Sequence, residues 1–374
     1  MTGSALELTQ DLIRINTINP PGNERACIDP LDAILADAGF TNTIHDFGPS
    51  RANLVARMGG SGEKPPLCFT GHVDTVPLGL QPWSVDPFAA EIADGKLFGR
   101  GSSDMKSGVA AFTVAAITLA DRLDGTPGIV LVITAGEETG CDGAFDLARR
   151  NGALGEAGAM VVAEPTSNQP LAGHKGALWL NAHTEGVTAH GSMPDKGDNA
   201  IYKAARAISK LEEFDFNIAR HEMLGAPTLN VGAVHGGINI NSVPDQTDIS
   251  IDIRTIPGQD SAKIREQLTH YLGDEVTLET TIDVPGIWTD PEHDWIRIVS
   301  DSTAKITGES YSPDTVPYFT DASALTPAMG NPPTVILGPG EAAQAHQTNE
   351  YCVVERIGEA VAIYECIIAD WCAL

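Results

Sequence analysis

Short apolar segments of strand length, separated by helical patterns, are the feature that most limits the folds open to this chain. The segments "PLCFTGHVDT", "GIVLVITAGEE" and "AMVVAEP" are apolar at consecutive positions, as strands are when both faces of a parallel sheet are buried. Between the first two, "MKSGVAAFTVAAITLADRL" has the periodicity of a long amphipathic helix. This alternation predicts an α/β fold with a mixed, mostly parallel sheet flanked by helices.

The middle of the chain predicts a domain of another kind. Between residues 177 and 284, four segments alternate apolar and polar side chains, as half-exposed antiparallel strands do, and two helical patterns lie among them. Their order is strand, helix, strand, strand, helix, strand, which is typical of an α+β ferredoxin-like domain. We therefore expect residues 1–176 and 285–374 to form one discontinuous α/β domain, with 177–284 inserted into it.

The charge balance and the cysteines exclude some partners and indicate a compartment. Fifty acidic residues against 23 basic ones give a net charge of −27, which argues against binding to nucleic acid or to an anionic membrane. Neither a signal peptide nor an apolar run long enough to span a bilayer is visible. The six cysteines include no C-x-x-C pair, so we expect free thiols and a cytoplasmic protein.

Side chains of the metal-binding type follow several of the predicted strands of the α/β domain. In open α/β sheets ligands bind beyond the carboxyl ends of the strands, so we expect these side chains to meet there. A single such residue would more often be structural, whereas seven at equivalent places indicate a metal centre. In chain order they are His72, Asp74, Asp104, Glu137, Glu138, Glu164 and His346.

The spacing of these residues indicates different roles. His72 and Asp74 are two positions apart on a strand and point to the same side, which suits a metal-bound imidazole with a carboxylate that orients it. Glu137 and Glu138 are adjacent, so on extended backbone their side chains diverge, and one can bind metal while the other acts as a base. The candidate ligand set contains no cysteine and leaves one glutamate that need not bind metal. Both features favour an open catalytic site for zinc, cobalt or manganese.

Six motifs spread over nearly the whole chain resemble those of the M20 family of co-catalytic zinc amidohydrolases and peptidases. They are "GHVDTVP", "GRGSSDMKSG", "AGEETG", "AEPT", "GVTAHGSMP" and "GPGEAAQAHQTNEY". Within that family the chain resembles deacylases of the acetylornithine deacetylase and succinyl-diaminopimelate desuccinylase type. The stretch "YFTDASAL" departs from the Gly-Thr-Ser-Asp-Gly-like stretch of the desuccinylases, which weakens that particular match. The resemblance implies a zinc-peptidase-like catalytic domain and an inserted lid or dimerisation domain.

The resemblance also implies a ligand set for two divalent metals, in the first place zinc, with cobalt or manganese as alternatives. Asp104 would bridge the two ions. His72 and Glu164 would complete one site, and Glu138 and His346 the other.

Further residues acquire catalytic and substrate-binding roles from the same resemblance. Glu137 would be the general acid/base acting on a metal-bridging water, and Asp74 would support His72. His190 would reach from a partner subunit to stabilise the oxyanion and to contact substrate. Asn241 would be a second substrate contact, and Arg254 would bind the substrate carboxylate with its two-pronged guanidinium.

The chemistry expected from these residues is metal-assisted hydrolysis of the amide bond of a small N-acyl amino acid. A dipeptidase or carboxypeptidase of the same family is the alternative within the enzymes. A non-catalytic relative that binds acyl-amino acids is the alternative from another class, and the full ligand set together with Glu137 argues against it. The expected partners are a small-molecule substrate and a second copy of the chain, joined through the inserted domain.

Overall fold

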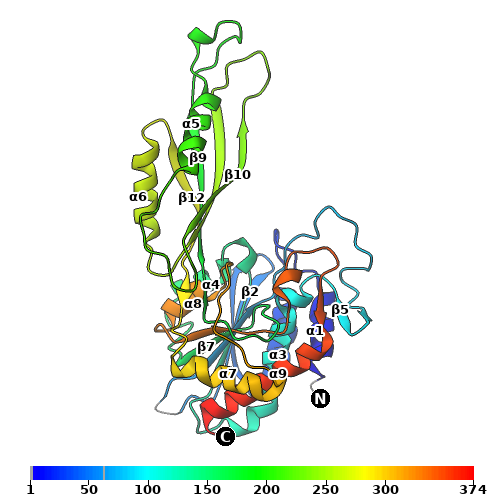
Figure 1. Ribbon diagram of the computed structural model, residues 1–374. Helices are drawn as coiled ribbons and strands as arrows, with labels where there is room; N and C mark the ends of the chain where they lie inside the picture. The colour runs from blue at the N-terminus through cyan, green and yellow to red at the C-terminus, as the bar shows by residue number, and fades with distance from the viewer. Residues whose placement is uncertain (1–2, 62–63) are drawn as a thin grey trace. The chain divides into compact units, whose positions relative to one another are not determined.

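The computed structural model describes residues 3–61 and 64–374, and these divide into two compact units (Figure 1). The first unit comprises the chain up to Gly173 together with Trp288–Thr315 and Thr320–Leu374. The second unit comprises His174–Ile287 and Val316–Phe319. Its main segment begins and ends within three residues of the predicted insertion at 177–284.

The first unit is built on a six-stranded sheet with the order β1-β2-β6-β3-β7-β14. The strands are β1 (Thr41–Gly48), β2 (Arg51–Met58), β3 (Leu67–His72), β6 (Ile129–Thr134), β7 (Ala159–Val162) and β14 (Thr334–Ile336). Four of them, β6, β3, β7 and β14, run parallel, while β2 is antiparallel to β6 and β1 to β2. The expected mixed, mostly parallel sheet is therefore confirmed.

Helices cover the sheet because its central strands β3, β6 and β7 are buried at consecutive positions and need partner layers. Leu67 and Phe69 of β3 lie in one buried cluster with Ile28, Phe112 and Tyr364, which come from three different helices. Phe69 packs edge-on against the Tyr364 ring at 5.2 Å. The helices of this unit are α1 (Ala5–Arg14), α2 (Arg25–Asp37), α3 (Ser107–Leu119), α4 (Asp142–Arg149), α7 (Asp294–Thr307), α8 (Ala322–Ala328) and α9 (Val354–Cys372).

The structure also contains short strands outside the two larger sheets. They were not predicted, because segments of two or three residues are too short to show a periodic pattern of apolar side chains. They are β4 (Ile92–Ala93), β5 (Lys96–Phe98), β8 (Gly173–His174), β13 (Ile287–Trp288) and β15 (Tyr351–Val353). Strand β15 pairs with β5, and β5 with β4. The pairing of β15 with β5 brings the segment after His346 beside the segment before Asp104. Both His346 and Asp104 are predicted metal ligands.

The second unit is a four-stranded antiparallel sheet of order β10-β11-β9-β12 with two helices packed on it. Its elements are β9 (Gly176–Glu185), α5 (Ala200–Glu212), β10 (Thr228–Gly236), β11 (Gln246–Thr255), α6 (Ser261–Leu272) and β12 (Thr277–Val284). Inward-facing Leu180, Ile251 and Ile253 meet Ala207 and Leu268 of the helices. The chain order of strands and helices is the ferredoxin-like one that the sequence predicts.

Candidate metal centre

The carboxyl ends of β3, β6 and β7 lie level with one another, and this brings the predicted ligands together. In the parallel register His72 pairs with Thr134, and Thr70 pairs with Val162. The residues that follow these pairs are the "AGEE" turn after β6 and Glu164 after β7. Parallel pairing in this register therefore gathers side chains that lie up to 92 positions apart in the chain at one edge of the sheet.

Asp104 lies between two histidines, with one carboxylate oxygen towards each. Its Oδ1 is 3.2 Å from His72 Nε2, and its Oδ2 is 3.5 Å from His346 Nε2. Glu138 Oε2 lies 3.0 Å from the same His346 nitrogen. A carboxylate that faces two imidazoles from opposite oxygens has the arrangement needed to bridge two cations.

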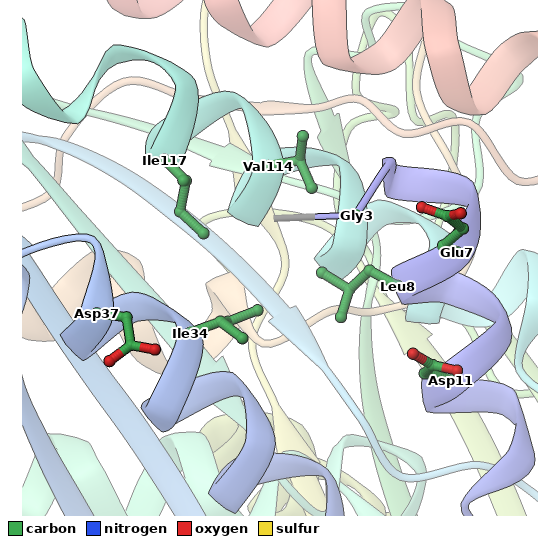
Figure 2. A pocket seen from close by; sticks show the side chains of 8 residues that line it. All are labelled: Gly3, Glu7, Leu8, Asp11, Ile34, Asp37, Val114 and Ile117. Carbon is green, nitrogen blue, oxygen red and sulfur yellow. The ribbon is translucent and has the colours of Figure 1, made fainter. Parts of the chain in front are cut away.

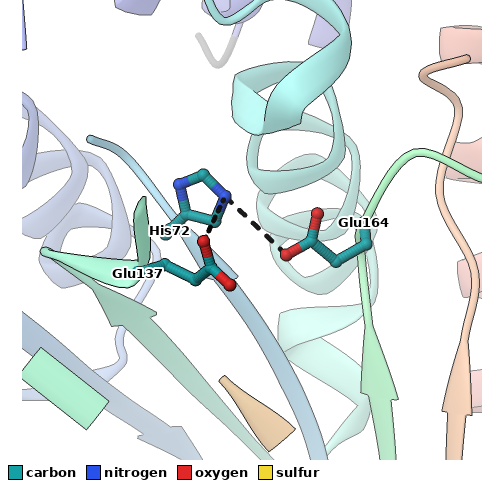
Figure 3. A group of neighbouring side chains, drawn as sticks. All are labelled: His72, Glu137 and Glu164. Atoms are coloured by element: carbon teal, nitrogen blue, oxygen red, sulfur yellow. Dashed lines mark ion pairs between the residues drawn. The ribbon is translucent and has the colours of Figure 1, made fainter. Parts of the chain in front are cut away.

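Figure 3 shows His72 with Glu137, which follows β6, and Glu164, which follows β7, directed at its ring. Glu164 Oε1 lies 3.7 Å from His72 Nε2, and Glu137 Oε2 lies 3.9 Å from it. Ligand atoms of His72, Glu137 and Glu164 all fall within 4.8 Å of one another, and so do those of His72, Asp104 and Glu138. The donors are imidazole and carboxylate, which suits zinc, cobalt or manganese.

A close approach of α3 to the end of β7 brings the loop of Asp104 to Glu164. A Cβ placed on Gly108 would lie 2.2 Å from the Ala163 carbonyl oxygen, so only glycine fits at this point of the helix. The helix itself starts at Ser107, two residues later than the segment "MKSG" suggests, because Asp104 and Met105 have non-helical backbone angles. The loop residue Asp104 is thereby held above the sheet edge and outside the helix.

The two adjacent glutamates diverge for a reason other than the one expected. They lie in a short 3-10 turn, Glu137–Thr139, which follows Gly136 with a φ of 77°, and the backbone there is not extended. Successive side chains in such a turn point about 120° apart. Glu137 therefore faces His72, while Glu138 faces His346.

Asp74 holds the glutamate turn more closely than it holds His72. Its Oδ1 accepts a hydrogen bond from the Glu137 N–H and its Oδ2 accepts one from the Glu138 N–H, both at 3.2 Å. His72 Nδ1 lies 3.0 Å from the Asp74 backbone oxygen and 3.5 Å from its carboxylate. Asp74 thus connects the imidazole to both glutamates, whereas the sequence predicts contact only with His72.

Two buried residues beside the centre were not identified as site residues from the sequence. Asn19 donates from Nδ2 to Asp74 Oδ2 at 3.0 Å. Asp321 accepts a hydrogen bond from the hydroxyl of Thr134, the last residue of β6. Asparagine and aspartate are common in loops, so no spacing could have singled these two out; only the fold brings Asn19 within reach of a residue 55 positions away.

Burial makes the centre a site of unbalanced negative charge. Desolvation, reinforced by neighbouring carboxylates, raises the pKa of Glu137 and of Glu164 well above the ordinary value. Desolvation also raises the pKa of Glu138 to about 7 and that of Asp321 to about 6. So many buried carboxylates can be ionised together only beside a cation.

Two carboxylate oxygens at the centre, Glu138 Oε1 and Asp321 Oδ1, lack a hydrogen-bond partner within residues 3–61 and 64–374. Glu138 Oε1 is buried and accepts no hydrogen bond from any of them, although an orphaned carboxylate oxygen costs free energy. Two opposing effects act on the pKa of His72. Burial lowers it, but the hydrogen bonds to Asp104 and Asp74 outweigh burial and raise the pKa above its ordinary value. The residues present therefore fit a bound divalent metal.

The three remaining predicted residues belong to the second unit, where they fall into two groups. His190 forms a bridge with Ser242, and the Gly191 N–H donates to the Asn241 carbonyl at 2.8 Å, so His190 and Asn241 are neighbours. Arg254 lies at the other end of β11 and is ion-paired with Asp252 at 3.0 Å.

The first unit also holds a cavity of about 210 Å³ between α1, α2 and α3. Figure 2 shows its floor of apolar side chains, among them Leu8 and Ile34, with carboxylates around it. Two of these carboxylates already have partners, since Glu7 caps α1 at Ser4 and Asp11 pairs with Arg14. None of the predicted site residues lines this cavity, so the candidate chemistry belongs to the sheet edge.

Comparisons with known proteins find relatives over nearly the whole chain. A family model described as peptidase family M20/M25/M40 matches residues 68–370. The chain is 31% identical over 363 residues to acetylornithine deacetylase of Myxococcus xanthus, covering 92% of each chain. It is 29% identical over 395 residues to a probable succinyl-diaminopimelate desuccinylase of Staphylococcus epidermidis, covering 96% of each.

Solved structures share the fold over the whole chain. A tripeptidase from Staphylococcus aureus matches with a TM-score of 0.76 and 26% identity, covering 99% of this chain and 98% of that one. An M20 family metallo-carboxypeptidase from Sulfolobus solfataricus matches with a TM-score of 0.82 at 18% identity, covering 100% of both. Among the described residues, no helix is long and apolar enough to cross a membrane.

Proposed function

The chain belongs to peptidase family M20/M25/M40, and from this premise we propose that it hydrolyses the amide bond of a small N-acyl amino acid. The observation that carries the proposal is Asp104, whose two oxygens face His72 and His346. Around it lie the buried carboxylates of Asp74, Glu137 and Glu164. The named deacylase relatives cover almost the whole chain, which supports a deacylase as the first candidate.

We propose two divalent ions, in the first place zinc, with cobalt or manganese as alternatives. His72 and Glu164 would hold one ion, Glu138 and His346 the other, and Asp104 both. Bound there, the ions would lower the pKa of a water molecule and polarise the substrate carbonyl.

Glu137 is the residue that we propose moves the proton. Its carboxylate lies within 3.9 Å of His72 Nε2, and Asp74 fixes its backbone N–H. In the reaction Glu137 would accept a proton from the attacking water and deliver it to the amide nitrogen, so that the C–N bond breaks and a neutral amine leaves. The products are a carboxylic acid and an amino acid.

Substrate recognition is assigned to the second unit, for which we propose the role of lid and dimerisation domain at residues 177–284. Arg254 would bind the substrate carboxylate through its guanidinium. His190 would stabilise the oxyanion, and Asn241, which lies beside it, would make a second contact.

These two groups of residues support a homodimer. Arg254 pairs across the sheet with Ala177 and Gln246 with Glu185, so Arg254 lies eight positions along β11 from the end nearest His190. Eight strand residues span about 26 Å, which is too far for one small substrate to touch both side chains of one copy. The two can meet in one site only if His190 comes from a second copy.

Strand β10 offers the surface for this dimer. It is an edge strand that pairs with β11 alone among the described strands of its sheet (Figure 1), and a free edge is a template for pairing. Val234 on β10 is 52% exposed, and Ile238 and Ile240 beyond it are 91% and 104% exposed. We expect sedimentation at twice 39.4 kDa, and a proline at Val234, which blocks edge pairing, should give monomers. A monomeric wild-type protein would contradict the dimer.

A peptidase is the second candidate, favoured by the 26% identity to a tripeptidase over nearly the whole chain. A non-catalytic relative that binds acyl-amino acids would keep the fold without needing Glu137 beside the ligands. We also propose a cytoplasmic location, which is supported by six free cysteines.

A release assay tests the proposal against both alternatives. Purified protein loaded with zinc, cobalt or manganese is given N-acetyl, N-succinyl and N-formyl amino acids and unblocked di- and tripeptides, and free amine is measured. We expect turnover of at least one N-acyl amino acid and much weaker turnover of its carboxyl methyl ester, because the ester lacks the charge that Arg254 would bind. Turnover of peptides alone would favour the peptidase, and binding without turnover the non-catalytic relative.

A further inference from the structure

Glu350 is a buried carboxylate that no predicted role includes, although it lies against the loop that carries Asp104. Its side chain is fully buried. Its Oε1 accepts hydrogen bonds from the N–H groups of Ser103 and Asp104 at 2.8 and 3.0 Å. Its Oε2 accepts one from the Gly101 N–H at 2.9 Å and one from Arg100 Nη1 at 2.6 Å.

With four donors on two oxygens, Glu350 has no lone pair directed at a metal. It satisfies three backbone N–H groups in a stretch whose backbone, at Asp104, is not helical. Buried N–H groups need an acceptor, and here the acceptor comes from a residue 246 positions away. Arg100, which is 1% exposed, supplies the positive charge that this buried carboxylate requires.

The same contacts tie together the two loops that carry predicted ligands. Ser103 Oγ donates to the Tyr351 carbonyl at 2.7 Å and accepts from the Glu341 N–H at 3.0 Å. A Cβ on Gly340 would lie 2.2 Å from the Ser103 carbonyl oxygen, so the two segments touch. The segment from Gly340 to Tyr351 includes His346, the second histidine that faces Asp104.

We propose that Glu350, neutralised by Arg100, is a positioning residue that holds the Asp104 carboxylate between His72 and His346. This inference rests on the proposed metal-binding role of Asp104. It goes beyond that role by assigning the position of the bridging carboxylate to a residue that binds neither metal nor substrate. Without Glu350, three backbone amides of the Asp104 loop would lose their acceptor, and the loop would lose the spacing that two ions require.

The test compares Glu350→Gln with a matched control, Glu341→Gln. Both changes neutralise a glutamate of the same segment that pairs with an arginine, but the Glu341 side chain pairs with Arg356 and accepts a hydrogen bond from the Tyr351 hydroxyl, both outside residues 100–106. An Asp104→Ala variant serves as the reference for lost metal binding. Hydrogen exchange of metal-free protein, metal content after dialysis, and the absorption spectrum of cobalt-loaded protein are measured, since none of them needs a substrate.

For Glu350→Gln we expect exchange in peptides covering residues 100–105 to rise about tenfold, since a buried acceptor is lost. Metal affinity should fall roughly 10–100-fold, the cobalt spectrum should shift, and kcat should fall while KM stays within about threefold. Glu341→Gln should leave exchange in these peptides, metal affinity and spectrum unchanged. Wild-type exchange and metal affinity in Glu350→Gln would overturn the inference.

A second variant keeps the test decisive if Glu350→Gln does not fold. Glu350→Asp retains the charge for Arg100 but withdraws the carboxylate by one methylene, so it cannot reach all three amides; we expect intermediate exchange and affinity, and wild-type values would overturn the inference. The proposed function fails separately, if wild-type protein with both metals bound releases no amine from any substrate.

Discussion

Replacing Glu137 by glutamine is expected to abolish nearly all turnover while leaving the metals bound. Glutamine has almost the same shape but cannot accept the proton of the attacking water. Loss of a general acid/base costs about 10²–10⁴-fold in rate, and we expect the upper part of this range because one residue serves both proton transfers. The measurements are kcat on the best N-acyl substrate and metal content after dialysis.

The control for this prediction is Glu156→Gln, which changes an exposed loop glutamate and should leave kcat unaltered. Metal content matters because Glu137 lies almost as close to His72 as Glu164 does. If Glu137→Gln lost one equivalent of metal together with activity, Glu137 would be a ligand and the base would have to be sought elsewhere. Substantial activity with full metal content would likewise refute its role.

Removing the metals should abolish activity and also change how stability depends on pH. Burial raises the pKa of Glu138 from 4.5 to about 7 and shifts Glu137 and Glu164 in the same direction. Below about pH 4.5 these groups are protonated in the folded and the unfolded chain alike. As pH rises towards 7 the unfolded chain releases protons that the folded chain retains, so metal-free protein loses stability.

The metal-loaded protein should not show this loss, because its ligands are ionised in the bound state. We expect the Tm difference between metal-loaded and metal-free protein to be at least about 5 °C larger at pH 8 than at pH 5. The pKa shifts amount to a few kcal/mol of stability, and each kcal/mol shifts Tm by roughly 2–4 °C. Differential scanning calorimetry of protein stripped with a chelator and then dialysed measures this, and added zinc, cobalt or manganese should restore activity.

Glu138→Gln provides an unusual control for the pH effect. It removes a predicted ligand, yet metal-free Glu138→Gln should be more stable than metal-free wild type at pH 8 and similar to it at pH 5, because the amide has no charge to bury. Equal Tm values at both pH values would show that the buried carboxylate is not the cause. Retention of both metals by this variant would contradict its assignment as a ligand.

Much of the fold could be predicted because it depends on local patterns. The sequence shows strands β3, β6 and β7, which are apolar on both faces, and the strands of the second unit, in which apolar and polar residues alternate. The spacing of apolar side chains along a strand indicates which of its faces are buried. Strand β1 was missed, because "TNTIHDFG" lies at the sheet edge, is at least partly exposed throughout and lacks a clear alternation. Its pairing with β2 supplies what its own sequence does not.

The identities of the predicted metal ligands were also available from the sequence, because strand ends in an open α/β sheet converge at one edge. The different roles of these residues were harder to predict from the sequence. Adjacent glutamates on a strand would diverge by alternation, but Glu137 and Glu138 diverge because Gly136 starts a tight turn. Asp74 lies beside His72 as expected, and its carboxylate in addition accepts hydrogen bonds from the amides of both glutamates.

The sequence by itself determined the chemistry: imidazoles and carboxylates at strand ends, a spare glutamate, and motifs of a metal-dependent hydrolase family. Only the tertiary structure decided what holds that chemistry in place. Asn19, Asp321 and Glu350 reach the centre across 55, 187 and 246 positions of the chain. Such hydrogen bonds leave no periodic pattern in the sequence, because each partner is determined by which donors and acceptors lie close together after folding.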